Sequence, residues 1–157
     1  MKKYFALTMA LVSVTAVANT NKPVNSHTAE QKPPMMVLTT VDVSGKVMKP
    51  LNSRVYSLSK AKTELCWEVF NIPFIAKNRI TEVFDTPDTA KFTTTDSSIV
   101  SSNDNKTHTI ITYQPSINNE LIRRCWKFDK TDPLGTYKLT LQVNDVTFPT
   151  QTFSVVK

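Results

Sequence analysis

The sequence predicts an all-β fold, a sandwich of about seven to nine short antiparallel strands, from three observations. Threonine supplies 22 of the 157 residues and glycine only 2, and β-branched residues favour strands. Short alternating segments are separated by turn residues at roughly the 8–12-residue spacing typical of sandwiches. No segment carries the 3.6-residue period of a long helix. The composition of 40% apolar and 20% charged residues also excludes a wholly disordered chain and a transmembrane bundle.

The beginning of the chain has the three parts of a secretory signal peptide. Residues 1–18 contain a basic start, an apolar core too short to span a membrane, and a final Ala-Val-Ala cleavage site. Residues 19–35 hold three prolines and few large apolar groups, which predicts a flexible leader. Residues 36–157 are then a single domain. We expect a bacterial protein exported by the Sec route, periplasmic or secreted, with no integral membrane segment after cleavage.

The first five expected strands alternate apolar and polar residues and end at glycine, proline or acidic turns. They are residues 37–43, 54–58, 64–70, 79–84 and 91–95. The third is the clearest, because Leu65, Trp67 and Val69 occupy every second position and Pro73 follows. The fifth is the weakest, and residues 96–106 after it are expected to form a polar loop.

Four further strands are expected in the second half of the domain. They are residues 107–113, 121–128, 136–143 and 146–156. Asn144 and Asp145 connect the last two, and both residue types tolerate the left-handed backbone of a two-residue hairpin turn. Pro149 interrupts the returning strand, which predicts a sheet edge or a bulge there.

Cys66 and Cys125 are predicted to form one structural disulfide, because an even cysteine count in an exported chain favours a bridge. Each cysteine has charged residues two positions before and after it, on its own face of the strand. These are Glu64, Glu68, Arg123 and Lys127. Their charges match if the two strands are neighbours, in either the antiparallel or the parallel direction. The tryptophans that follow the cysteines then face the core.

Residues 132–139, DPLGTYKL, resemble the turn and strand near the end of immunoglobulin-like domains, including many bacterial ones. The resemblance implies an immunoglobulin-like β-sandwich and a structural Tyr137, whose hydroxyl often bonds to nearby backbone in that superfamily. Antibody-type domains place a cysteine two residues after this tyrosine, where this chain has Leu139. The resemblance implies no function.

Several kinds of chemistry are disfavoured by the residues present. Two glycines exclude a glycine-rich phosphate loop, and a serine protease triad would depend on His108 alone. Acidic pairs at Glu82 with Asp85 and at Asp129 with Asp132 are expected at strand ends, as turn formers. Asp96 and residues 103–105 lack the spacing of a calcium loop. The basic residues are scattered without aromatic motifs, which disfavours nucleic acid. We expect a non-enzyme without cofactor or metal.

The remaining expectation is binding to an unknown protein partner. Ile72, Phe74 and Ile75 lie in a connection between strands, residues 71–78, and apolar loop residues often mark contact sites. The alternative is that they cover the open end of the sandwich. A second function is inhibition of a hydrolase by this loop. A fimbrial subunit and an enzyme of unrecognised type stay open as further alternatives.

Overall fold

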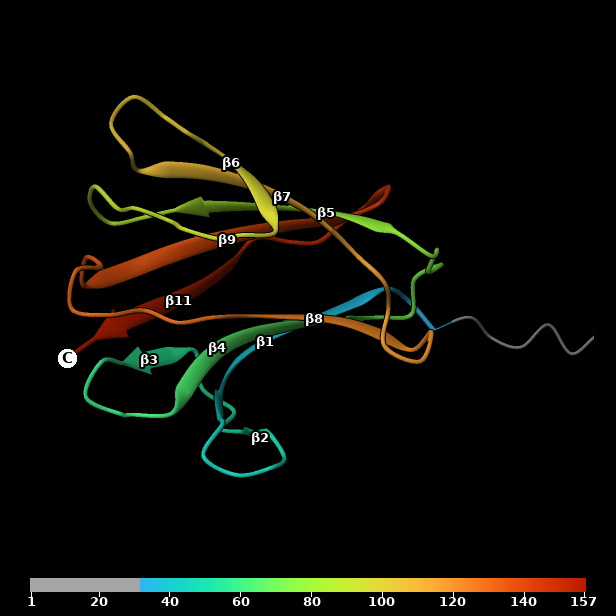
Figure 1. Cartoon of the computed structure of the whole chain (residues 1–157), viewed down its shortest axis with the longest axis horizontal. Helices are drawn as coiled ribbons and strands as arrows, with labels where there is room; N and C mark the ends of the chain where they lie inside the picture. Colours follow the sequence, from blue (N-terminus) through green and yellow to red (C-terminus); the bar gives the residue numbers. More distant parts are fainter. Residues whose placement is uncertain (1–31) are drawn as a thin grey trace, which may run out of the picture. The chain divides into compact units, whose positions relative to one another are not determined.

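The computed structural model describes residues 32–157, which form two β-sheets (Figure 1). The expected signal peptide and most of the expected leader lie outside the described residues. Strands follow the order β2-β1-β4-β8 in one sheet and β3-β11-β9-β5-β7-β6 in the other, with β10 beside β9. Their bounds are β1 Met35–Asp42, β2 Lys49–Pro50, β3 Val55–Ser57, β4 Thr63–Phe70, β5 Asn78–Asp85, β6 Ser97–Ser101, β7 Thr107–Gln114, β8 Leu121–Trp126, β9 Gly135–Val143, β10 Val146–Thr147 and β11 Gln151–Val156. Within these residues there is no helix, and hence none that could cross a membrane.

The predicted β-sandwich is confirmed, and two of the expected strands need correction. Residues 91–95 are irregular, and the strand is instead β6, which lies within the predicted polar loop 96–106. Among the described strands, β6 is the last of its sheet and pairs only with β7, and its central Ile99 packs on the core. A largely polar sequence is therefore sufficient to form this edge strand. The expected strand 146–156 is divided into β10 and β11 around Pro149, and β11 pairs with β3 in parallel.

The core lies between the two sheets, and alternate residues of the central strands fill it. β4 contributes Leu65, Trp67 and Val69, and β9 contributes Tyr137, Leu139, Leu141 and Val143, all at most 1% exposed. This is the period-two burial that one-sided strands produce. The alternation recognised in the sequence therefore identifies the inward face of both strands.

The pairing of β4 with β8 confirms the predicted disulfide and its surroundings. Cys66 is bonded to Cys125 and lies directly opposite it in an antiparallel register. Lys127 Nζ lies 3.1 Å from Glu64 Oε1, and Arg123 forms an ion pair with Glu68. The cysteines and these charges share the outer face of the sheet.

Tyr137 forms the backbone contact that the immunoglobulin-like resemblance implies. Its side chain is buried, and its Oη–H donates to the carbonyl of Pro133 at 2.7 Å. Burial, reinforced by the nearby Asp132 carboxylate, raises the pKa of the Tyr137 hydroxyl. Gly135, two positions before Tyr137, has a φ of 139°. A Cβ atom at this position would lie 2.9 Å from Pro87 Cβ. This turn therefore requires both residue types.

Replacing Tyr137 with phenylalanine should lower the free energy of unfolding by about 1 kcal/mol, because the Pro133 carbonyl loses its donor while the ring packing stays. Urea unfolding followed by fluorescence measures the change. Tyr113→Phe is the matched control, since Tyr113 is 52% exposed, and it should leave stability unchanged. Equal effects of the two substitutions would contradict a structural role for the Tyr137 hydroxyl.

Candidate functional site

Residues 71–78, which connect β4 to β5 and include the first residue of β5, are called the contact loop here, and three apolar residues in it differ in exposure. Ile72 is 6% exposed and belongs to the core, whereas Ile75 is 57% exposed. Phe74 is half-buried and packs against the core cluster. Two of the three predicted contact residues therefore hold the loop on the sandwich, and one points into solvent.

A buried asparagine holds the contact loop in place. Asn78, at the start of β5, is 0% exposed. The N–H of Ile75 donates to its Oδ1 at 3.0 Å, and its Nδ2 donates back to the Ile75 carbonyl at 2.8 Å. Its Nδ2 also donates to the Gln114 carbonyl, and Asn144 Nδ2 donates to its Oδ1. Because both backbone groups of Ile75 are fixed, the exposed side chain is presented from an ordered position.

A surface hollow of about 500 Å³ lies beside Ile75. Loop 71–78, the start of β5 and the β9–β10 turn surround it. Its lining residues are Pro73, Ile75, Arg79, Gln142, Val143, Asn144, Asp145 and Val146. A concave site with apolar walls and a few polar groups is the usual form of a binding site. The exposed Ile75 side chain therefore lies at a concave surface.

A buried carboxylate joins the two sheets at a second place. Glu82 in β5 is 0% exposed and shares the inward face with Ile80 and Phe84. Its Oε1 accepts from the indole N–H of Trp67 at 2.6 Å and of Trp126 at 2.7 Å. Its position in mid-strand corrects the expectation that Glu82 is a turn former at a strand end. Burial raises the pKa of Glu82, and the adjacent guanidinium opposes that rise.

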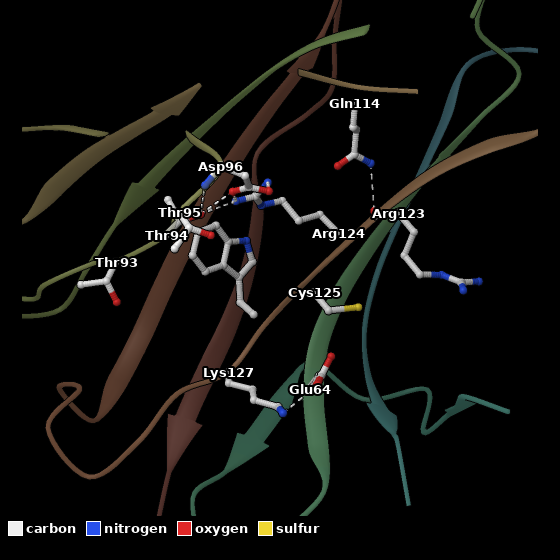
Figure 2. Close-up of a pocket in the computed structure, with 11 residues that line it drawn as sticks. Glu64, Thr93, Thr94, Thr95, Asp96, Gln114, Arg123, Arg124, Cys125 and Lys127 are labelled. Atoms are coloured by element: carbon white, nitrogen blue, oxygen red, sulfur yellow. Dashed lines mark hydrogen bonds and ion pairs between the residues drawn. The ribbon is translucent and has the colours of Figure 1, made fainter. Parts of the chain in front are cut away.

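Arg124 in β8 extends the Glu82 contact to the surface. Its Nε lies 3.2 Å from Glu82 Oε2, and its Nη2 lies 3.2 Å from Asp96 Oδ1. Hydrogen bonds from Thr94 and Ser97, assisted by Arg124, lower the pKa of Asp96 to about 2. Figure 2 shows Arg124 reaching from β8 towards Asp96 and Thr94. The guanidinium is thereby neutralised from both sides and fixed in direction.

A groove of about 770 Å³ lies between β8 and residues 93–96 (Figure 2). We call it the β8 groove. Its walls carry three cationic and two acidic side chains, together with polar ones. The lining residues are Glu64, Thr93, Thr94, Thr95, Asp96, Gln114, Arg123, Arg124, Cys125, Trp126 and Lys127. The groove could not be predicted from the sequence, because the pattern of residues 91–95 predicts a strand where the structure has irregular backbone.

Of the other acidic residues considered from the sequence, Asp129 and Asp132 share a turn, and the rest do not come together. Glu82 is buried, whereas Asp85 is exposed on the opposite face of β5. Asp132 Oδ2 accepts the backbone N–H of Asp129 at 2.8 Å in a turn, and burial raises the pKa of Asp132. Asp96 precedes β6 and residues 103–105 follow it, so they do not share a cation site.

His108 is buried in β7 and serves local structure. Its Nδ1 lies 2.8 Å from Ser101 Oγ on the neighbouring strand, and its Nε2 lies 3.0 Å from the carbonyl oxygen of Asn105. Its ring contacts Phe92, with ring centroids 4.8 Å apart. The residue therefore joins β6, β7 and the turn between them.

One comparison with known proteins agrees with this architecture. A family model described as the PM0630 beta sandwich domain matches residues 36–156. The protein named "Uncharacterized protein PM0630" from Pasteurella multocida is 31% identical over 160 residues, covering 100% of each chain. A solved alkylpurine DNA glycosylase of Pseudomonas fluorescens, bound to DNA containing an abasic site analog, is 11% identical with a TM-score of 0.37. That likeness covers 78% of this chain and 30% of the glycosylase, and it carries no conclusion. The chain belongs to the PM0630 β-sandwich domain family.

Proposed function

We propose that this chain is an exported, non-enzymatic protein that binds a protein partner through the contact loop, in the periplasm or outside the cell. The observation that carries the proposal is Ile75, a 57% exposed apolar side chain whose backbone is fixed by the buried Asn78. Because its backbone is already fixed, Ile75 loses less conformational freedom on binding than a residue of a mobile loop would, which favours affinity. The signal-like residues 1–18 and the disulfide support export.

The hydrolase inhibitor is the second candidate, and the same hydrogen bonds favour it. An inhibitory loop has to keep its shape while it occupies an enzyme cleft, and preorganisation reduces the cost of doing so. Asn78 supplies that rigidity through its hydrogen bond to the Ile75 backbone. Ile72 and Phe74 hold the loop on the sandwich by packing in the core. The two candidates differ in the partner: an inhibitor lowers the turnover of the hydrolase it binds, whereas a simple binding protein has no such effect.

Substituting Ile75 with aspartate should weaken partner binding at least about tenfold, because a central apolar anchor becomes a charge that must be desolvated. Residues 19–157 are immobilised, envelope and host proteins are passed over them, and each captured protein is titrated against the variants. Val100→Asp is the matched control, since Val100 on β6 is 67% exposed and far from the contact loop in sequence.

The control should bind each partner with the affinity of the unsubstituted chain. A partner bound equally by the Ile75 and Val100 variants contacts another surface, and that result contradicts the proposed role of the loop. If a captured protein is a hydrolase, its turnover with and without this chain separates the two candidate functions.

A further inference from the structure

Among residues 32–157, the edge of β8 that faces away from β4 has no neighbouring strand, because β8 is the last strand of its sheet. This edge borders the β8 groove, and residues 93–96 form the opposite wall (Figure 2). An unpaired edge presents backbone donors and acceptors to any extended chain that reaches it. The groove is therefore bordered by β8 on one side and by the irregular residues 93–96 on the other.

The orientation of the backbone groups along this edge follows from two observations. The carbonyl of Arg123 accepts from Gln114 Nε2 at 3.1 Å, so it points away from β4. Cys66 and Cys125 have a Cα separation of 4.0 Å, the close spacing of a pair that exchanges no backbone bonds. The N–H and C=O of Cys125 therefore point into the groove. Among the turn, loop and side-chain hydrogen bonds of residues 32–157, none involves either of these groups.

The charges on the outer face of β8 select among extended chains. Arg123 and Lys127 lie on either side of Cys125 on this face. Their acidic partners, Glu68 and Glu64, belong to β4, and Glu64 also lines the groove beside Lys127. The Lys127 side chain is 69% exposed. A strand added at the free edge would place its residues beside these two cations, where opposite charges are favourable and like charges are not.

We propose that the β8 groove binds an extended segment of a protein partner by strand addition, and that this segment carries two acidic residues four positions apart. The residue between the acidic pair lies opposite Cys125 and exchanges backbone hydrogen bonds with it. The acidic residues lie beside Arg123 and Lys127. The side chains between them face the groove wall formed by residues 93–96. The site is separate from the contact loop.

A second copy of this chain is a poorer occupant than an acidic segment. Antiparallel pairing of two β8 edges would put cationic side chains beside cationic side chains, which is unfavourable. Residues 93–96 also limit the space beside β8. A single strand fits there more readily than β8 of a second copy, which would bring its own residues 93–96 with it. The acidic segment satisfies both the backbone and the charges.

The heptapeptide TETVTET, acetylated and amidated, is a suitable probe because its glutamates are four residues apart. Titrated into ¹⁵N-labelled oxidised residues 19–157, it should cause saturable shifts of the backbone amides at 123, 125 and 127. N-methylation of its glutamates and valine should abolish binding, because those N–H groups point to β8. N-methylation of its threonines should preserve binding. The lysine analogue TKTVTKT should bind at least about tenfold more weakly.

Variants of the protein separate this proposal from the contact loop. Lys127→Glu should weaken TETVTET binding about tenfold, Lys157→Glu is the charge-matched control, and Ile75→Asp should bind the peptide normally. Absence of saturable shifts at the three amides overturns the proposal. So does equal binding of both N-methylated peptides, which would indicate charge attraction alone. Shifts of the same amides on deleting residues 19–31, without peptide, would assign the groove to the chain's own leader and also overturn it.

Discussion

Glu82→Ala should lower the free energy of unfolding by about 3–5 kcal/mol, because it leaves buried donors without an acceptor. Two indole N–H groups donate to this carboxylate from the opposite sheet, and the Arg124 guanidinium forms an ion pair with it. Trp67 is 0% exposed, so water does not replace the lost acceptor without reorganising the core. Urea unfolding at neutral pH measures the difference.

The control for this substitution is Glu120→Ala, an exposed acidic residue that should change stability by less than about 0.5 kcal/mol. The dependence on pH gives a second readout. Because the pKa of Glu82 is raised in the folded protein, the folded state binds more protons above the unfolded value, and its stability falls as pH rises through that range. Glu82→Gln should remove this slope. A loss below about 1 kcal/mol for Glu82→Ala would contradict the role of the carboxylate.

The Cys66→Ala and Cys125→Ala double variant should lose about 4 kcal/mol of stability, since the bridge closes a loop with a sequence separation of 59 residues. The substitution frees the unfolded chain while the β4–β8 ion pairs remain available. Equilibrium unfolding with and without a reductant measures the change.

Reduction of the unsubstituted protein should reproduce the same loss, and the double variant should not respond to reductant. A double variant as stable as the oxidised protein would show that the sheet does not depend on the bridge. A reductant-sensitive double variant would show that the reductant acts elsewhere.

The adjacency of β4 and β8 could be predicted because its signal is local in sequence. Acidic residues flank one cysteine and basic residues the other, and a strand places both pairs on the cysteine face. The direction of pairing could not be predicted, since the charges fit both directions. Only the tertiary register, with Cys66 opposite Cys125 in an antiparallel pair, determines it.

The Glu82 contact was missed although part of its signal is present in the sequence. Ile80, Glu82 and Phe84 alternate along one strand, so period two places the carboxylate on the inward face. Its partners could not be identified, because Trp67 and Arg124 come from the opposite sheet and their approach depends on how the sheets pack. An inward acidic residue opposite tryptophans is a pattern that sequence analysis could use.

The contact loop shows the same limit at a smaller scale. Ile72, Phe74 and Ile75 are alike in composition, and a loop has no period that would separate inward from outward positions. Their different exposures come from the hydrogen bonds of Asn78 and from packing against the core. Likewise β6 carries few apolar residues, because an edge strand needs little burial to pair with its neighbour.

Site-specific photo-crosslinking in the cells that produce the protein tests the proposed function most directly. A photoreactive phenylalanine analogue replaces Ile75 in one strain and Val100 in another, and both positions are more than half exposed. Protein contact through the loop predicts a discrete, heavier adduct from position 75 and none from position 100. No adduct at position 75, or the same adducts at both positions, would contradict it.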